Sequence, residues 1–453
     1  MSPSGPGTRR RRGLRARLRG ALWPIPVAGV VLAVGAGIAL PALDGVLGRG
    51  SAGHPLDLVF GGGPAAARDL LAAIAGSLIS VTGLVFSLTV VALQLGSSQY
   101  SPRLLQTFAT DRVVQLTLAQ LTATFVYALT VLRTVRTEDA TSDESAFVPR
   151  LSITVGYALT LGSVLALVLF LGHLSRMLRV ETMLRDVHDE GSAALGREPP
   201  DEAEAGTGGA PVPPPGRGTP VPAASSGFVV DLDEATLVAA ARDRDAVVLL
   251  AARIGDSVVS GTPLAHVWPA PDPDAAEGLR VAVGRAVGLG FERSPERDVP
   301  YSLRKVVDIA VRALSPGIND PTTAVHALSH ASALLGDLVC RPLGPRRLTD
   351  RDGVLRVVVP QWTAPDLLDL ALEEPLQYAS GQPAVLRRLA ALLREVAWRA
   401  PRGLLDEPLC TRLAQVVAVA EESTRVPAAE RRAWVVRVEE ALAGRWPVEG
   451  EER

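Results

Sequence analysis

The sequence predicts an α-helical membrane protein with four transmembrane helices and a cytosolic α+β region, in which a small β module precedes a mostly helical domain. Apolar residues make up 47% of the 453-residue chain, and the mean hydropathy is +0.23. These values are too high for a wholly soluble protein and too low for a transporter whose whole length crosses the bilayer. Four uncharged apolar runs lie in the first part of the chain, and periodic patterns typical of soluble domains fill the rest.

Four runs have the length that a bilayer core of about 30 Å requires. They are Trp23–Leu43, Leu71–Leu95, Val113–Leu132 and Leu151–Gly172. The tail before them, residues 1–20, carries seven arginines and no acid, so the positive-inside rule places it in the cytoplasm. Four crossings return the chain to that side, and we expect both termini on the cytoplasmic face of a bacterial inner membrane. A cleaved signal peptide is the competing interpretation, disfavoured because its apolar core would be only about 7–15 residues long.

The second run has small and hydroxylated residues at helical spacing. Ala72, Gly76 and Ser80 are spaced four residues apart, and Gly83 and Ser87 repeat the step. The favoured interpretation is close helix packing through small residues, and the alternative is a hydroxyl-lined water path between subunits. Either interpretation makes Gly76, Ser80, Gly83 and Ser87 a pore or packing face. The second and third runs contain no Asp, Glu, Lys or Arg, which argues against an ion-coupled transporter.

Composition excludes several other classes of protein. The 46 basic and 48 acidic residues nearly balance, so the charge excess typical of nucleic-acid binding is absent and no nucleic-acid partner is expected. The two cysteines, Cys340 and Cys410, have no CxxC spacing, which excludes a zinc ribbon, an iron–sulfur site and a disulfide framework. We expect no cofactor.

The remaining chain divides by composition and periodicity. The helix of the last run is expected to continue, so the four-span domain with its helical extension covers residues 21–190. A Pro- and Gly-rich stretch predicts a disordered linker over 191–226, and short strands with Gly turns predict a small β-rich module over 227–270, including a helix near 234–241. A mostly helical domain is expected over 275–453. It contains a hairpin with an Asp352-Gly353 turn, followed by amphipathic helices over 365–380, 383–400, 403–422 and 427–444.

The densest motif lies between Tyr301 and Ala324. Apolar residues follow a helical period up to Leu314, while Arg304, Asp308 and Arg312 recur every fourth residue on another face. The helix must end before Pro316, and the next one begins with Asn319 or Asp320 as N-cap and Pro321 in its first turn. The favoured interpretation of the SPGINDP segment is punctuation between two helices.

The alternative is a polar pocket at this turn, which would bind an anion or a polar ligand together with the free amides of the new helix. Its ligand-binding or coupling candidates are Ser315, Gly317, Asn319, Asp320, Arg304, Asp308 and Arg312.

Three motifs resemble one known family. ALSPGINDPTTA, SLTVVALQLGSSQYSPRLL and the hairpin GDSVVSGTPL are similar to the bacterial membrane proteins grouped as domain of unknown function 2254. The resemblance implies four amino-terminal spans and a cytosolic carboxy-terminal region, and it implies no activity. It also draws attention to the loop after the second span, with Gln99, Ser101, Pro102 and Arg103 as a membrane-coupling loop. This loop lies on the same side as SPGINDP, so it either couples the two regions or forms an ordinary capped juxtamembrane turn.

His326 and His330 are the only histidine pair at metal-ligand spacing, and Asp337 lies about 10 Å further along the helix, too far for the same ion. We therefore expect two surface histidines and no metal. The GDSVVSGTPL hairpin also resembles those of biotinyl and lipoyl modules, but its segment lacks the lysine that would carry such a cofactor.

No nucleophile elbow, phosphate loop, dinucleotide fingerprint or HExxH motif occurs, so the sequence leans against an enzyme. The first hypothesis is a homo-oligomer in the lipid bilayer, whose cytosolic domain senses a ligand or partner and biases the spans, with a pore as one form of this. The alternative is a membrane-anchored scaffold that binds a cytosolic protein. A membrane-proximal enzyme using Asp308 or Asp320 as base is the third.

Overall fold

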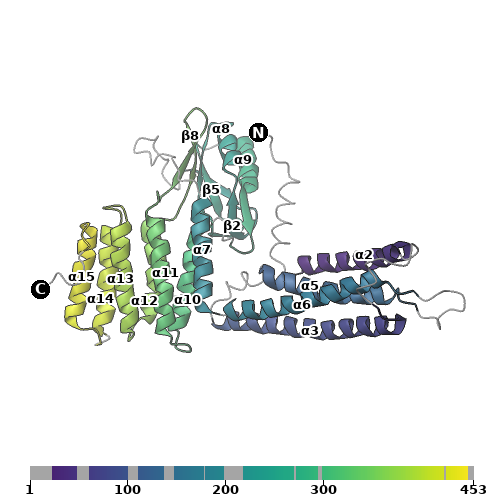
Figure 1. Cartoon of the computed structure of the whole chain (residues 1–453). Helices are drawn as coiled ribbons and strands as arrows, with labels where there is room; N and C mark the ends of the chain where they lie inside the picture. The colour runs from purple at the N-terminus through teal and green to yellow at the C-terminus, as the bar shows by residue number, and fades with distance from the viewer. Residues whose placement is uncertain are drawn as a thin grey trace. The chain divides into compact units, whose positions relative to one another are not determined.

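The computed structural model describes residues 23–47, 61–99, 111–136, 147–177, 179–197, 218–269, 272–293, 298–422 and 425–446. The chain forms two compact units, residues 1–179 and 180–453. Most of the described residues are helical, with strands only in the second unit's α/β part (Figure 1).

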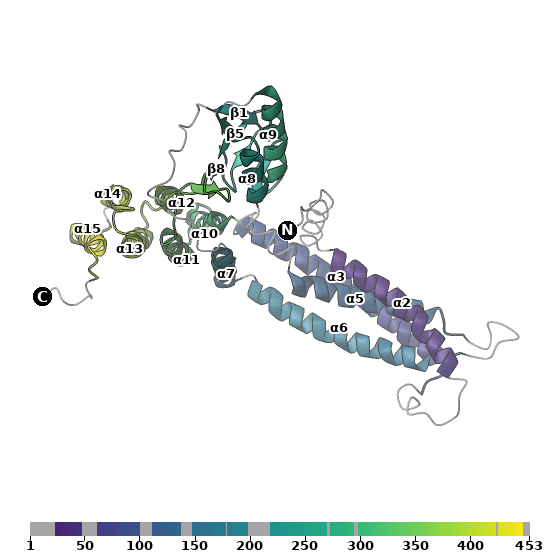
Figure 2. The same ribbon diagram turned by 90° about the horizontal axis from the view of Figure 1, so that it is seen from above.

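The first unit contains four long apolar helices, which confirms that part of the predicted fold class. They are α2 (Pro24–Leu47), α3 (Pro64–Gln99), α5 (Arg112–Leu132) and α6 (Arg150–Met177), and each is long and apolar enough to cross a membrane. The helices run alongside one another in Figures 1 and 2. Helix α5 is the most buried of them, whereas the other three expose large apolar side chains such as Leu32, Phe86 and Leu169. An apolar outer surface is what lipid contact requires.

Helix α2 packs closely on α5 through small residues. A Cβ added to Gly29 would lie 3.4 Å from the Cβ of Ala119, and one added to Gly37 would lie 2.7 Å from the Cβ of Thr130. Ala33, midway between the two glycines, is buried. The spacing i, i+4, i+8 is the small-residue pattern that allows helix backbones to approach. The same pattern was predicted for α3 from the sequence, but not for α2.

Polar contacts join the helices at each end of the four-helix unit. At one end Asp44 of α2 accepts hydrogen bonds from the backbone N–H groups of Leu151 and Ser152 at 3.1 and 3.0 Å, and from the Ser152 hydroxyl at 2.7 Å. At the other end Asp111 accepts from the first amides of α5, and its second oxygen lies 2.9 Å from Nε2 of His173 on α6. These acids satisfy amides that a helix start leaves without partners.

The second unit contains an α/β module built on two sheets. The larger sheet has the order β1-β5-β3-β8-β7 and the smaller has β4-β2-β6. Its strands and helices are β1 (Thr219–Pro222), β2 (Gly227–Leu232), α8 (Glu234–Arg242), β3 (Val247–Leu250), β4 (Ser257–Val258), β5 (Pro263–Trp268), α9 (Pro273–Ala286), β6 (Val287–Gly290), β7 (Arg346–Thr349) and β8 (Leu355–Val359). The predicted helix near 234–241 and the hairpin around Asp352-Gly353 are present as α8 and β7–β8.

The module is larger than the segment 227–270 that the sequence indicates. Strand β1 lies within the stretch expected to be a linker, and β8 pairs in parallel with β3 although it lies about 100 residues later in the chain. Val357 and Val359 of β8 are buried in the same core as Val248 and Val267. Residues 198–217 of the expected linker lie outside the described residues.

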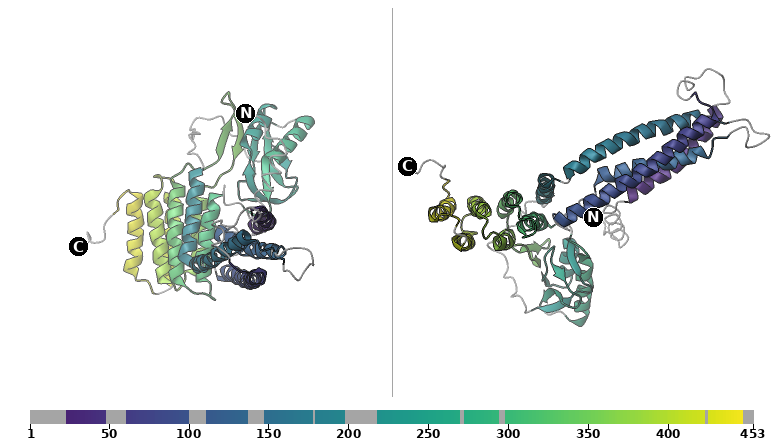
Figure 3. Two further views of the ribbon diagram at one scale, coloured as in Figure 1. Left: turned by 45° about the vertical axis from the view of Figure 1, so that its right-hand side comes forward. Right: turned by 90° about the horizontal axis from the view of Figure 1, so that it is seen from below.

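The remaining helices form a layered array. They are α7 (Val180–Arg197), α10 (Val299–Leu314), α11 (Pro321–Val339), α12 (Ala364–Tyr378), α13 (Pro383–Arg399), α14 (Asp406–Glu422) and α15 (Ala428–Leu442). Figure 1 shows them side by side, and Figure 2 shows the same helices nearly end-on. The views in Figure 3 agree with this arrangement. The four predicted helices from 365 onward correspond to α12–α15.

Helix α7 packs with the second unit. The sequence analysis treats residues up to 190 as an extension of the four-span domain, but the apolar side chains of Met183, Leu184 and Val187 are buried, and α7 contacts α10 and α11. Helix α7 also runs on to Arg197, past the expected start of the linker at 191.

Candidate functional site

The small-residue face of α3 is exposed. Gly76, Ser80, Gly83 and Ser87 all lie on the outer side of the helix, whereas Leu71, Ile74, Leu78 and Val85 face the other helices. Apart from the adjoining turns of α3 itself, no part of the described chain lies within 4 Å of a Cβ added to Gly76 or Gly83. The Ser80 hydroxyl donates to the Gly76 carbonyl of its own helix at 3.2 Å. This face therefore has no packing partner in the described part of the chain.

The SPGINDP segment forms a compact turn between α10 and α11. The Ser315 hydroxyl donates to the carbonyl of Arg312 at 2.7 Å, and the Asp320 N–H donates to the carbonyl of Ala313 at 2.7 Å. Asn319 has φ of +49°, a left-handed conformation that asparagine tolerates better than most residues. Its Oδ1 accepts a hydrogen bond of 2.8 Å from Gln382, the residue before α13. Gly317 and Ile318 are exposed at the tip.

Asp320 is the N-cap of α11. One of its oxygens accepts from the backbone N–H of Thr323 at 3.1 Å and the other accepts from the Thr323 hydroxyl. These hydrogen bonds lower the pKa of the Asp320 carboxyl, which therefore stays ionised at neutral pH and is a poor general base. The contacts of Ser315, Asn319 and Asp320 are those of a turn that ends one helix and caps the next. This is the interpretation that the residue types favour.

The predicted charge ladder of α10 faces α12. Arg304 donates to Asp308 at 2.8 Å and makes two hydrogen bonds to Glu374 of α12, at 2.6 and 2.8 Å. Arg304 and Asp308 are 23% and 10% exposed, so these charges lie between helices. Arg312 lies in the last turn of the same helix and is partly buried. Arg304, held by Asp308 of its own helix, thus joins α10 to α12.

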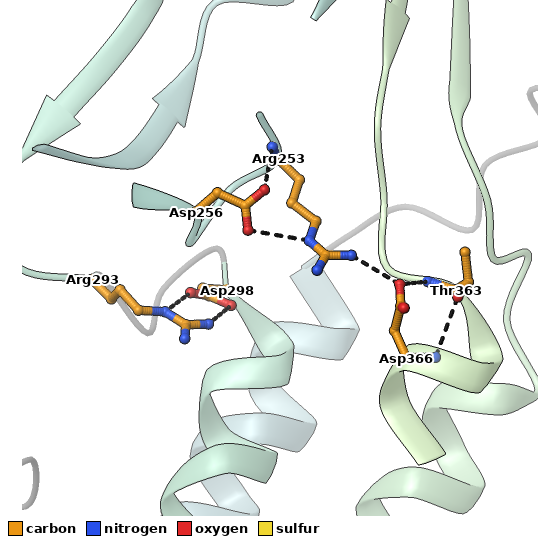
Figure 4. Close-up of polar contacts among 6 residues, drawn as sticks. All are labelled: Arg253, Asp256, Arg293, Asp298, Thr363 and Asp366. Atoms are coloured by element: carbon orange, nitrogen blue, oxygen red, sulfur yellow. Dashed lines mark hydrogen bonds and ion pairs between the residues drawn. The ribbon is translucent and has the colours of Figure 1, made fainter. Parts of the chain in front are cut away.

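A second polar cluster joins the α/β module to the helical array, as Figure 4 shows. Arg253, in the turn after β3, contacts Asp256 through Nε at 3.3 Å and Asp366 of α12 through Nη1 at 3.0 Å. Its guanidinium lies 3.8 Å from the centre of the Trp362 ring, a cation–π contact. Asp366 also completes a capping box with Thr363 at the start of α12. One arginine therefore ties the module to a helix start.

The start of α10 belongs to the same junction. Arg293 makes two hydrogen bonds to Asp298, at 2.7 and 2.9 Å, and Figure 4 places this pair beside the Arg253 cluster. Burial raises the pKa of the Asp298 carboxyl, and the hydrogen bonds from Arg293 offset only part of that effect. A Cβ on Gly255 would lie 2.5 Å from an oxygen of Asp298, so only glycine fits where the turn meets this helix start.

The single lysine of the chain connects α10 to α7. Lys305 is 2% exposed, and its ammonium lies 3.1 and 2.9 Å from the two carboxylate oxygens of Glu190. The same ammonium lies 5.0 Å from the centre of the Tyr301 ring, and the Arg293 guanidinium lies 4.8 Å from that ring. A series of neighbouring side-chain contacts therefore connects the junction drawn in Figure 4 with α7, by way of Tyr301 and Lys305 of α10.

Other predicted sites have different outcomes. Gln99 is the last residue of α3, and Ser101, Pro102 and Arg103 of the expected coupling loop lie outside the described residues. His326 is exposed, whereas His330 is partly buried and meets His188 of α7. In the described part of the chain, no group of three or more His, Cys, Asp or Glu side chains is placed to hold a metal ion.

Sequence reasoning missed Glu190, Arg253 and Trp362, because each acts through a partner far away in the chain. Two features of the sequence could have drawn attention to Lys305 and Arg253. A lysine that occurs once in an arginine-rich chain, and an arginine two residues before a Gly-Asp turn, are both unusual enough to deserve a role.

Comparison with known proteins gives a family and no activity. The chain matches the family model described as "Predicted membrane protein (DUF2254)" over residues 19–395. Uncharacterised proteins of Mycobacterium bovis and Mycobacterium tuberculosis are 34% identical to it over 421 residues, which is 91% of this chain and 78% of theirs. No solved structure matches the chain.

Proposed function

The chain belongs to the family of predicted membrane proteins called domain of unknown function 2254, and on this premise we propose that it is a homo-oligomer of the bacterial cell membrane. In this proposal α2, α3, α5 and α6 cross the bilayer, and the helical array and α/β module lie in the cytoplasm with both termini. The arginines of residues 1–20 support this orientation. The cytosolic region responds to a ligand or protein partner and shifts the conformation of the spans.

The exposed small-residue face of α3 is the observation that carries the proposal. Large side chains cover most of the outer surface of the four helices, yet Gly76 and Gly83 leave open space on α3. In a bilayer, apolar side chains gain little by leaving lipid, so helices associate where small residues let their backbones approach. Helix α2 packs on α5 within the chain through small residues in this way. We therefore infer that the small-residue face of α3 binds a second copy of the chain within the membrane.

A pore between copies follows from the hydroxyl groups on that face. Ser80 and Ser87 are exposed on α3, two turns apart by helix geometry. Facing each other across a symmetric contact, they would line a narrow polar path, because serine hydroxyls both donate and accept hydrogen bonds from water.

Helix α7 is the element through which the cytosolic region would act on the spans. Only residues 178 and 179 separate α6 from α7. The buried Lys305–Glu190 pair fixes α7 to α10, and the junction around Arg253 and Asp298 fixes the start of α10 to the α/β module. A ligand that alters this junction would thus change the position of α7, provided that the helical array can adopt two arrangements.

The test is the oligomeric state of the full chain in detergent and in lipid nanodiscs, measured by native mass spectrometry. Within the described parts of the four apolar helices, four exposed glycines have open space around an added Cβ: Gly35 on α2, Gly76 and Gly83 on α3, and Gly172 on α6. We expect Gly76→Leu/Gly83→Leu to convert the oligomer to monomers and the matched control Gly35→Leu/Gly172→Leu to leave it intact. Equal masses for the two variants would contradict the role of α3.

Exposed aromatic residues favour a scaffold as the second candidate function. Phe291 is 94% exposed, and Trp398 and Trp446 are both exposed and stack edge to face with ring centres 5.5 Å apart. Exposed aromatic side chains of this kind are common at protein interfaces. A scaffold predicts that a partner binds the unaltered protein and the α3 variant equally well.

A further inference from the structure

Two histidines meet where α7 packs on α11. The ring centres of His188 and His330 lie 5.6 Å apart, and the rings are inclined at 64° in an edge-to-face contact. Nδ1 of His188 is buried and has no hydrogen-bond partner. Neutral imidazoles suit this contact, because the edge of one ring lies against the face of the other. Two imidazolium ions at the same separation would repel each other.

Two neighbouring residues oppose protonation of His330. His326 lies one turn before His330 on α11, and Arg185 lies on α7 close enough to act on His330. The neighbouring charges on other helices are already paired: Lys305 of α10 with Glu190, and Glu395 with Arg388 on α13.

The remaining acids of this part of α7 lie on its surface. Asp186 and Asp189 are exposed, so solvent screens them from the histidine pair. The neighbouring groups that act on the charge of His330, namely His188, His326 and Arg185, all disfavour an added proton.

We propose that the His188–His330 contact is a pH-sensitive switch, in which protonation at mildly acidic pH loosens α7 from α11. The proposal concerns the docking of one helix within the second unit, and it stands whether or not the chain is a homo-oligomer. Because α7 follows α6 after two residues, the switch acts at the first helix beyond the four apolar ones.

The direction of the pH dependence follows from proton linkage. Burial, His188, His326 and Arg185 lower the pKa of His330 below its ordinary value of 6.5. An undocked α7 exposes this ring and restores the ordinary value, so the undocked state binds more protons as the pH falls. The docked state is therefore fully favoured above about pH 6.5 and loses stability as the pH falls below it.

Coulomb's law gives the size of the effect. Two unit charges 5.6 Å apart, at an effective dielectric constant of about 20, change a docking equilibrium by about a hundredfold. Partial exposure of both rings allows solvent screening, and we therefore expect at least about tenfold in an experiment.

The experiment is hydrogen exchange of the full chain in nanodiscs, read by mass spectrometry at about pH 7.5 and about pH 5.5, on either side of the ordinary histidine pKa. Protection factors, corrected for intrinsic exchange, are compared for peptides from α7. We expect protection of α7 to fall about tenfold or more at the lower pH. The double variant His188→Phe/His330→Phe should lose this pH dependence, whereas the control His266→Phe on β5 should keep it.

A second pair of variants keeps the test decisive if the phenylalanine variant misfolds. His330→Arg places a permanent charge in the contact and should release α7 already at neutral pH, while His326→Arg, at an exposed position, should leave α7 protected. The switch is refuted if α7 keeps its protection at the lower pH in the unaltered protein, if the double variant retains the same pH dependence, or if both arginine variants behave alike.

Discussion

Replacing Glu190 by Gln should destabilise the second unit more than replacing its partner Lys305 by Met. The two side chains form one ion pair, but the side chain of Lys305 is 2% exposed and that of Glu190 is 29% exposed. Glu190→Gln therefore leaves a charge that water cannot reach. Lys305→Met leaves a carboxylate that can turn toward solvent and fills the lysine site with an apolar side chain of similar length.

The difference should be large enough to measure. Breaking a buried ion pair by removing one partner costs about 3–5 kcal/mol, because the remaining charge is uncompensated. We assign Glu190→Gln about 3 kcal/mol, since the amide still offers one hydrogen-bond acceptor. Lys305→Met should cost about 1 kcal/mol, as apolar replacements of buried charges usually do little harm. The double variant should resemble Lys305→Met.

Intrinsic tryptophan fluorescence during thermal unfolding of the full chain is a suitable assay, because five of the six tryptophans lie in the second unit. At about 2–4 °C per kcal/mol, Glu190→Gln should lower the melting temperature by about 6–12 °C and Lys305→Met by about 2–4 °C. Equal shifts, or a larger shift for Lys305→Met, would refute the reasoning from exposure.

Two further predictions concern the helices themselves. Gly37→Leu should cost about 1–3 kcal/mol by forcing α2 away from Thr130 of α5, whereas Gly35→Leu should change little, and the fraction of protein that remains monodisperse after heating in detergent compares the two. Asp320→Ala should remove the N-cap of α11 and cost about 1 kcal/mol. Because hydrogen bonds lower the pKa of Asp320, this contribution is present at neutral pH and is lost as the pH falls through the depressed value, so melting curves of the variant and the unaltered protein should converge in acid.

The sequence predicts those features that depend on neighbouring residues. Run length alone identifies the four apolar helices, because a bilayer requires about 20 apolar residues in succession. The ends of α10 and α11 follow from Pro316, Asp320 and Pro321, which act on the backbone next to them. The interpretation of SPGINDP as punctuation rests on the same local chemistry, and the hydrogen bonds of this turn support it.

Features that depend on distant partners could not be predicted. Lys305 and Glu190 are 115 residues apart, and no periodic pattern indicates which faces of their helices will meet. The parallel pairing of β3 with β8 is non-local in the same way. His330 resembled a surface residue because the sequence pairs it with His326 on its own helix, whereas its packing partner His188 comes from α7.

The face of α3 shows how one pattern can have two uses. Gly29, Ala33 and Gly37 on α2 and Ala72, Gly76 and Ser80 on α3 share a spacing of four residues, yet of these two sets only the one on α2 is packed within the described chain. The spacing of small residues identifies a helix that another helix can approach closely. Only the structure shows whether that other helix belongs to the same chain.

Ion flux through the full-length protein in liposomes tests the proposed function most directly. We expect the unaltered protein to conduct, Ser80→Leu/Ser87→Leu to abolish the flux, and the control Gly35→Leu/Gly172→Leu to preserve it. Flux that survives the serine substitutions, or no flux from liposomes that contain intact oligomers, would contradict a pore lined by α3 and leave the membrane-anchored scaffold as the better explanation.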